Sequence, residues 1–421
     1  MAGNESQVVG VELERVAPKV PTLFERDDTF FSVIEKRPVE VISARDMRIP
    51  LELRPGGKFG YFNPDGGDLG RGDMSTYDKA LINSVHMKHA VEFTAKTHWA
   101  TDNSRKANID AFRRNLATSM AEFRRQCDSQ CMTDGTGTVG TISSVSSAGG
   151  IDTYTLTSDG FGAKLIRYGQ NINIYNAALT TNRTAGGEVT ITMVDIANRT
   201  ISVTPSVAGA IATDMLVVSG LSATPPTGML GVKYHNSNAS TGTWLGLDRS
   251  INPEIRSNRV NGNNSALTLP LPRLAINKIG DRLGISERGK KLQAWTHPAQ
   301  QASYEELAMS MIRIDKTAKE EGVDLYFNDN MRLAGAPLKV SYSWDRTRID
   351  FIDIDTWGRA EMHPPGFYKN PDSGQRVWEI RGSSGGVATS WVFYITASFN
   401  LYNGNPAASA YIDNLAVPSG Y

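Results

Sequence analysis

Residues 48–132 constrain the fold more than any other part of this sequence. A long hairpin, Arg48–Ser84, is rich in glycine, proline and charged residues, and it returns through an alternating strand into one long amphipathic helix. The hairpin is too long for its own domain and offers little apolar surface to fold against it. Because burial of apolar surface drives folding, we expect this segment to lie on another molecule, and a neighbouring copy of the same protein is the natural candidate.

The strand and the helix are distinguished by the period of their apolar residues. In His86–Trp99, polar and apolar side chains alternate, which is typical of a strand with one wet and one packed face. In the helix, expected at 103–132, apolar residues recur at spacings of three and four. They form its candidate core: Ile109, Phe112, Leu116, Met120 and Phe123. A helix of about 25–30 residues measures ~40 Å and is about twice the usual length.

The charge balance limits the partners that the chain can attract. The 421 residues include 44 basic and 44 acidic side chains, so any contact with DNA should be weak and local. The N-terminus lacks a secretory signal pattern and no run of about 18 apolar residues occurs, so we expect a protein that folds in the cytosol and does not cross a membrane. Cys127 and Cys131 are one helical turn apart, a spacing that favours two reduced thiols.

The composition changes twice along the chain. Residues 1–47 show no sustained period and indicate an extended arm, whereas 133–225 carry few charges and many Thr, Ser, Gly and Ala residues. Short strand-like runs separated by turn residues predict a small all-β domain there, inserted after the long helix. Residues 226–421 return to a mixed α/β pattern, with a helix beginning near Pro298. The strand-like runs are 138–145, 153–156, 171–175, 188–196, 200–204 and 215–218, and later 338–342, 348–354, 376–380 and 391–401.

One motif permits an enzymatic interpretation. Gly382–Gly386 matches G-x-S-x-G, in which Ser384 would be the nucleophile of a hydrolase on a strained turn from a strand into a helix. The residues that follow, Val387–Ile395, have the composition of a strand and no helical period. We therefore expect a hairpin loop there, with a hydrolase that uses Ser384 as the weaker alternative.

Two groups of side chains resemble metal ligands. Asp353 and Asp355 lie two apart in a predicted strand, which would place both carboxylates on one face, although nearby arginines would neutralise them. His86, His89 and His98 form the only histidine cluster in the sequence, but His89 would point to the opposite face of its strand. We expect no metal, no cofactor and no catalytic residue.

Several stretches resemble one known family. Leu245–Pro253 follows the β-rich stretch, Trp295–Gln300 leads into the next helix, and Phe399–Pro406 closes the last long strand. Together with the arm, the glycine-tipped loop and the long helix, in this order, they resemble the major capsid proteins of tailed double-stranded DNA bacteriophages, the Hong Kong 97-type family. The resemblance covers nearly the whole chain.

The resemblance implies an α+β capsid fold with peripheral and axial domains. Its parts would be an arm at 1–47, an extended loop at 48–84, a peripheral-domain strand and spine helix at 85–132, the inserted β domain at 133–225, and the axial domain with the remainder of the peripheral domain at 226–421. In this family the arm and the loop reach across adjacent subunits. The charged loop residues are then expected at inter-subunit contacts: Lys58, Asp65, Asp68, Arg71 and Asp73.

The implied function is structural. The protein would self-assemble into hexamers and pentamers of an icosahedral shell around the double-stranded DNA genome, in a virion assembled in the bacterial host cytoplasm. The expected partners are a separate scaffolding protein, a portal at one vertex, a decoration protein and, through weak non-specific contacts, the packaged DNA. An encapsulin-like nanocompartment shares this fold and is the alternative.

Overall fold

The chain divides into two compact units, each made of several sequence segments. Unit 1 comprises 1–31, 85–128 and 362–399, and unit 2 comprises 32–84, 129–361 and 400–421. A computed structural model of the chain describes residues 29–36, 40–41, 46–65, 68, 70–94, 105–157, 162–184, 187–221, 223–284, 291–309, 331–370, 374–381 and 387–419.

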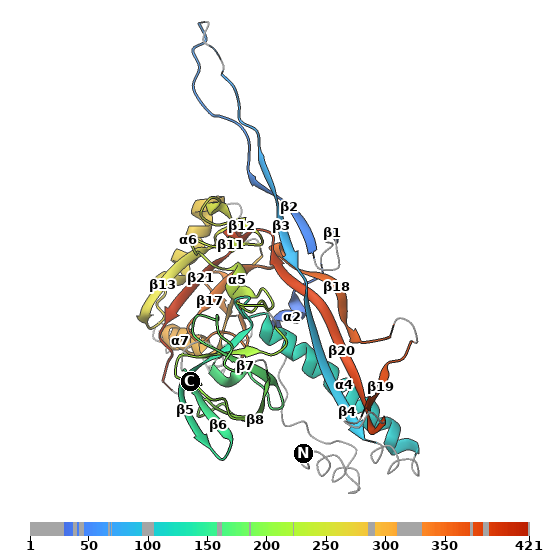
Figure 1. Cartoon of the computed structure of the whole chain (residues 1–421). Coiled ribbons are helices and arrows are strands. Elements are labelled where there is room, and N and C mark those ends of the chain that lie inside the picture. Colours follow the sequence, from blue (N-terminus) through green and yellow to red (C-terminus); the bar gives the residue numbers. More distant parts are fainter. Residues whose placement is uncertain are drawn as a thin grey trace, which may run out of the picture. The chain divides into compact units, whose positions relative to one another are not determined.

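Unit 1 combines a four-stranded sheet with a long helix (Figure 1). Strand β20 pairs with β18, β19 and β4, so it is the strand that joins the sheet together. The strands are β4 (Val85–Thr94), β18 (Trp357–Phe367), β19 (Val377–Arg381) and β20 (Val387–Asn403), and β18 and β20 extend into unit 2. The helices are α2 (Thr29–Val33) and α4 (Arg105–Gln130).

Strand β4 has the alternation that the sequence predicts. From His86 to Glu92 the even-numbered side chains are exposed, and from Val85 to Phe93 the odd-numbered ones are half-buried. The strand pairs antiparallel with β20, with Val85 opposite Phe399 and Thr94 opposite Ser390. The predicted strand is therefore confirmed as far as Thr94, and the stretch from Ala95 to Trp99 lies outside the described residues.

Helix α4 has 26 residues, as long as the sequence predicts. Phe123 is buried and Met120 is half-buried, and the ring of Phe123 lies 6.4 Å from the ring of His89 on β4. Of the predicted helix core, the side chains of Ile109, Phe112 and Leu116 lie outside the described residues. Cys127 near the end of α4 and Cys131 just after it are both buried, and no disulfide joins them.

The buried carboxylate of Asp128 joins the two helices of unit 1. One of its oxygens, Oδ1, accepts hydrogen bonds from the backbone nitrogens of Phe30 at 2.9 Å and Phe31 at 2.8 Å. Amides in the first turn of a helix have no acceptor within the helix, and a carboxylate satisfies them well. Asp128 therefore fixes the start of α2 against the end of α4.

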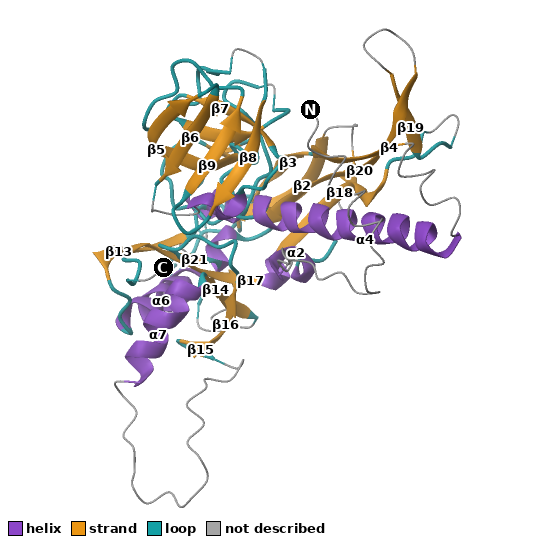
Figure 2. Ribbon diagram, turned by 90° about the horizontal axis from the view of Figure 1, so that it is seen from below, coloured by secondary structure: helices purple, strands orange, loops and turns teal. Residues whose placement is uncertain are grey.

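Unit 2 is built on a six-stranded sheet in the order β13-β21-β17-β14-β16-β15. Helices α6 (Pro270–Leu283) and α7 (Pro298–Met309) lie against it (Figure 2), and Ala275 and Ile276 of α6 share one apolar core with residues of the strands. The strands are β13 (Asn258–Ser265), β14 (Leu292–Thr296), β15 (Arg332–Leu333), β16 (Ala336–Val340), β17 (Ile349–Asp353) and β21 (Ala410–Leu415).

Residues 138–218 form a closed barrel with the strand order β10-β5-β6-β9-β8-β7 (Figure 2). Its interior contains alternate residues of the strands, including Tyr154, Ile174 and Ile201. The six strand-like runs recognised in this stretch of sequence coincide with its six strands. These are β5 (Thr138–Ala148), β6 (Ile151–Leu156), β7 (Asn171–Tyr175), β8 (Val189–Asp195), β9 (Thr200–Thr204) and β10 (Met215–Val218).

A buried carboxylate organises one side of the barrel. Asp152 accepts hydrogen bonds from Ser147 Oγ at 2.5 Å, from Tyr154 Oη at 2.8 Å and from the backbone nitrogen of Val207 at 2.7 Å. Burial by itself would raise the pKa of Asp152, but the hydrogen bonds from Ser147, Val207 and Tyr154 together lower it below its ordinary value. The charged form of Asp152 is therefore the form that the fold stabilises.

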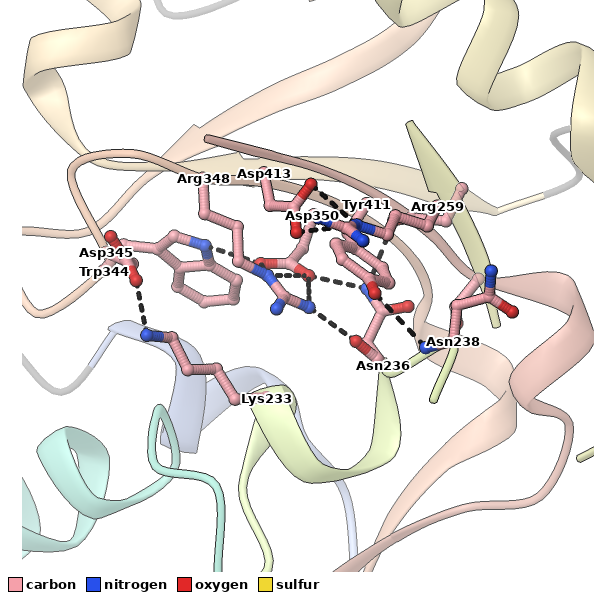
Figure 3. A network of polar contacts seen from close by, with 12 residues as sticks. Lys233, Asn236, Asn238, Arg259, Trp344, Asp345, Arg348, Asp350, Tyr411 and Asp413 are labelled. Carbon is pink, nitrogen blue, oxygen red and sulfur yellow. Dashed lines mark hydrogen bonds and ion pairs between the residues drawn. The ribbon is translucent and has the colours of Figure 1, made fainter. Parts of the chain in front are cut away.

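A buried ion pair lies at the centre of the main sheet of unit 2 (Figure 3). Arg348 and Asp350 are both on or next to β17, and the two guanidinium nitrogens Nε and Nη2 of Arg348 contact Asp350 Oδ1 at 2.9 and 2.7 Å. The guanidinium also lies over the ring of Tyr411 on β21, 4.1 Å from its centre. Burial would lower the pKa of Arg348, but the charge and hydrogen bonds of Asp350 raise it.

Neighbouring elements complete this network. Trp344 Nε1 donates to Asp350 Oδ2 at 3.0 Å. Asn236 follows α5 (Val232–His235); its Nδ2 donates to Asp350 Oδ1 at 2.6 Å, and its carbonyl oxygen accepts from Arg348 at 2.6 Å. The network therefore ties α5 and the loop before β17 to the sheet (Figure 3).

Removal of the buried cation should destabilise unit 2. We expect Arg348→Met to cost about 3–5 kcal/mol, because it leaves the Asp350 carboxylate buried and unpaired. The matched control is Arg259→Met, which breaks the more exposed pair with Asp413 and should cost no more than about 1 kcal/mol. Urea unfolding measures both. The double variant Arg348→Met with Asp350→Asn should recover part of the loss, and equal losses in the single variants would contradict this account.

The barrel should lose stability in acid through Asp152. Because its folded pKa lies below its unfolded pKa, the stabilisation is present at neutral pH and is lost as the pH falls through the lowered pKa. We expect Asp152→Asn to cost about 1–3 kcal/mol at neutral pH and much less in acid. Hydrogen exchange of barrel peptides, compared with the control Glu188→Gln at an exposed carboxylate of the barrel, measures this. A cost that does not change with pH would contradict the assignment.

Candidate subunit-contact surface

The hairpin that the sequence singles out is anchored at its base in unit 2. Strands β2 (Asp46–Arg54) and β3 (Thr76–Asn83) pair antiparallel, from Asp46 opposite Asn83 to Arg54 opposite Thr76. Met47, Ala80 and Ile82 are buried at this base. With the short strand β1 (Glu40–Val41), β2 and β3 form a three-stranded sheet. The base of the hairpin is thus part of the packed body.

An ion pair fixes the outer end of the paired strands. Arg54, the last residue of β2, donates from Nε to Glu254 Oε1 at 2.8 Å and from Nη2 to the carbonyl oxygen of Ile251 at 2.9 Å. The hydrogen bond and the charge of Glu254 raise the pKa of Arg54. Because this pair is largely exposed, we assign it a role in orienting the hairpin and little role in stability.

The short helix that carries Glu254 is itself held by helix α6. Glu254 lies in the 3₁₀ helix η2 (Pro253–Ile255), and Arg282 near the end of α6 donates to the carbonyl oxygens of Pro253 at 2.9 Å and Glu254 at 3.3 Å. Glycine at 284 ends α6 with its amide bonded to the carbonyl oxygen of Gly280. A continuous series of contacts therefore connects the main sheet, through α6 and η2, to Arg54 at the outer end of the paired strands.

Beyond Arg54 the two arms of the hairpin stay close to each other as far as Lys58 and Asp73. The amide of Gly57 donates to the carbonyl oxygen of Asp73 at 2.9 Å, and Lys58 Nζ lies 3.1 Å from Asp73 Oδ1. A Cβ atom at Gly56 would lie only 2.6 Å from the backbone nitrogen of Ser75, so glycine is required for this close approach. Figure 1 shows this part of the hairpin running outward from β2 and β3.

The outer part of the hairpin exposes apolar side chains. Phe59 is 94% exposed, Tyr61 98% and Met74 94%, and Phe62 is also exposed. The rings of Phe59 and Tyr61 lie 5.9 Å apart in an edge-to-face arrangement. The expectation that this hairpin has little apolar surface is therefore wrong. Three aromatic residues within Phe59–Phe62 were a sequence signal for this surface, hidden by the surrounding glycines and charges.

The charged loop residues are exposed but only two of them meet. Lys58 and Asp73 form the ion pair described above, while Asp68 accepts from the amide of Gly70 at 3.0 Å. Asp65 and Arg71 are exposed. Their contact with a second subunit stays a prediction.

A strand, and not the helix that a hydrolase would need, follows the G-x-S-x-G motif. Ser384 itself lies outside the described residues, but β19 ends at Arg381 and β20 begins at Val387, antiparallel to it. A nucleophile elbow requires a helix after the serine. A strand follows instead, as the sequence predicts.

The paired aspartates are arranged differently from the prediction. Strand β17 ends at Asp353, which accepts a hydrogen bond from the amide of Asp355 at 3.1 Å and so begins the 3₁₀ helix η4 (Ile354–Thr356). Asp355 pairs with Lys291 at 2.9 Å. The prediction that both carboxylates share one face of a strand is wrong, because the capping bond ends the strand between them.

The histidines of β4 are separated as predicted. His86 is exposed, and its Nδ1 lies 2.7 Å from Ser398 Oγ, whereas His89 is half-buried against α4. Burial lowers the pKa of His89, and the charge of Glu122 opposes this shift. His98 lies outside the described residues. Within the part of the chain that the structure describes, no three His, Cys, Asp or Glu side chains are placed to hold a metal ion.

Comparison with known proteins identifies the fold. Neither a protein-family model nor a curated protein matches the sequence. Among solved structures, the cyanophage A-1(L) capsid asymmetric unit is similar with a TM-score of 0.55 and 11% identity over 95% of this chain and 96% of that chain. The bacteriophage PhiM1 mature capsid has a TM-score of 0.47 at 10% identity over 96% and 91% of the two chains.

The holo-SrpI encapsulin complex of Synechococcus elongatus PCC 7942 has a TM-score of 0.44 at 11% identity over 99% of this chain and 97% of that chain. Of these three structures, the cyanophage capsid alone exceeds a TM-score of 0.5, and we assign the fold from it. None of the helices in the described ranges could cross a membrane. The chain has the fold of a phage capsid subunit, and the α+β Hong Kong 97-type fold predicted from the sequence is confirmed.

Proposed function

We propose that this chain is the major capsid protein of a tailed double-stranded DNA bacteriophage. In this role it would assemble into hexamers and pentamers of an icosahedral shell and would not act as an enzyme. Its fold, shared with the cyanophage capsid over 95% of this chain, supports the proposal. A separate scaffolding protein, a portal, a decoration protein and packaged DNA are the partners that such a shell would need.

The observation that carries this proposal is the hairpin beyond Arg54. Its side chains from Pro55 to Met74 are exposed wherever they are described, and they include apolar groups of the kind that a soluble monomer buries. The glycine-dependent pairing and the Arg54–Glu254 contact hold it away from the packed base. A segment held out in this way can bury its aromatic side chains on a neighbouring subunit.

Assembly should depend on the hairpin while folding does not. Replacement of residues 56–73 by a two-residue turn keeps Arg54 and Thr76, and it should change the melting temperature of the subunit little, since loop length costs only about 0.6 kcal/mol per doubling. We expect the shortened protein to sediment only as small species where the parent forms shells. Normal assembly, or a strongly destabilised monomer, would contradict the proposal.

The aromatic side chains should supply more of the contact energy than the charges. Burial of a phenylalanine-sized side chain stabilises a contact by about 1.5–3 kcal/mol, and about 1.4 kcal/mol changes an association constant tenfold. We therefore expect Phe59→Ser with Tyr61→Ser to raise the concentration needed for assembly at least about tenfold. Light scattering against concentration measures this.

A matched control is Tyr168→Ser, because Tyr168 is an exposed aromatic residue of the barrel. It should leave the assembly threshold unchanged. Equal effects of the control and of the hairpin variant would show that exposed aromatic residues act without regard to position. Loss of assembly in Lys58→Ser with Asp73→Ser alone would assign the contact to the charges.

A further inference from the structure

Strand β3 forms one edge of the three-stranded sheet at the base of the hairpin, in the order β1-β2-β3. The amide of Leu81 on this strand points away from β2, because it donates to the carbonyl oxygen of Leu245 at 2.8 Å. Along an antiparallel strand, the backbone groups of successive residues point alternately toward the partner strand and away from it. The N–H and C=O groups of Lys79 and Tyr77 therefore face the same edge as those of Leu81.

Two further contacts agree with this direction. Lys79 lies opposite Pro50 of β2, which has no N–H group to donate to it. The amide of Lys79 donates instead to its neighbour Asp78, with N and Oδ1 2.7 Å apart. Among the described residues, the backbone of Tyr77 has no hydrogen-bond partner on this edge, and Tyr77 is 69% exposed. This open edge, Tyr77–Lys79, can accept one more strand.

The opposite edge of the sheet is less suited to a further strand. On β2, Arg48 pairs with Glu40 of the short strand β1. The next residue of β2 whose backbone faces that edge is Pro50, which has no N–H group. A proline at an edge position is one of the devices that prevent pairing with another chain. Extension of the sheet is therefore favoured at β3.

The outer arm of the hairpin is a segment that can supply this strand. Within the described residues, the bond from the amide of Gly57 to the carbonyl oxygen of Asp73 is the outermost backbone hydrogen bond between the two arms. Residues 58–63 beyond it are exposed and belong to no sheet. Phe59 and Tyr61 alternate, so both would lie on one face of an added strand. Figure 1 shows this arm running outward from β3, so it cannot reach the open edge of its own copy.

We propose that residues 58–63 of one copy add as a strand to the open edge of β3 in a second copy. Main-chain hydrogen bonds then supply the pairing, and the carboxylate of Asp78 turns aside to free the amide of Lys79. The donor and the acceptor are different surfaces of the chain, so the contact is heterologous and closes into rings where its rotation permits. This inference rests on the proposed shell, and it names the surface that receives the hairpin.

Proline substitutions in the full-length protein test the backbone pairing. Tyr77→Pro removes an N–H group of the open edge and no hydrogen bond within the subunit, and we expect it to raise the concentration needed for assembly about tenfold. The matched control is Glu52→Pro, because Glu52 lies directly opposite Tyr77 and its N–H group faces the other edge of the sheet. It should assemble as the parent does, and the two proline variants should melt at the same temperature. Tyr77→Ser keeps the N–H group and should assemble as the parent does. Light scattering against concentration measures assembly.

Hydrogen exchange identifies the donor. In the assembled parent, the amides of Tyr77 and Lys79 should exchange more slowly than in the unassembled subunit. The protein in which a two-residue turn replaces 56–73 keeps the open edge but lacks the donor arm, whereas Tyr77→Pro keeps the donor arm. A mixture of these two proteins should therefore slow exchange at the open edge of the shortened protein, which stays unprotected when it is alone.

The outcomes separate this inference from the proposed function. A parent protein that forms no shells contradicts both. If the parent assembles but the two proline variants change the threshold equally, or if Tyr77→Ser loses as much as Tyr77→Pro, the backbone of the open edge does not carry the contact. Amides of Tyr77 and Lys79 that stay unprotected in the shell would overturn the inference as well. An edge that stays unprotected in the mixture would overturn the assignment of residues 58–63 as the donor.

Discussion

The buried ion pair between Arg348 and Asp350 is the interaction on which the geometry of unit 2 depends. It sits where the central strands of the main sheet meet α5, and a lone charge in this position would be far more costly than the pair. The amide of Asn236 and the indole of Trp344 use the remaining oxygen sites of Asp350. Because these groups come from different segments, the pair sets how the segments lie on the sheet.

A series of contacts connects this part of unit 2 to the hairpin that we assign to assembly. Helix α6 lies on the sheet, Arg282 at its end holds η2, and Glu254 of η2 holds Arg54. Each contact is modest, but together they direct a hairpin that is exposed along its outer half. A rigid base with an exposed outer part suits a subunit that reaches across its neighbour, since little entropy is then lost when the contact forms.

The elements predicted from the sequence are those whose apolar residues recur at a regular spacing. The long helix and the barrel strands follow from the spacing of apolar residues, and they were found at nearly the predicted bounds. Helix α6 was missed although Ala275, Ile276 and Ile279 recur at helical spacing, because the prolines of its first turn were not recognised as the start of a helix. The contact of Arg54 with Glu254 joins residues 200 positions apart, and the capping bond of Asp353 depends on backbone geometry. Neither leaves a signal in one sequence. The exposed aromatic residues do leave a signal in the sequence, at Phe59–Phe62, but the high charge and glycine content of the hairpin led to the prediction of little apolar surface.

The central claim is that the folded chain builds a shell from copies of itself. Negative-stain electron microscopy of the purified full-length protein tests it most directly, because the result requires no assumption about which residues touch. The account predicts closed shells, or flat sheets in which identical hexamers repeat at a regular spacing. A field of uniform single subunits, at concentrations well above those at which the protein is purified, would contradict it.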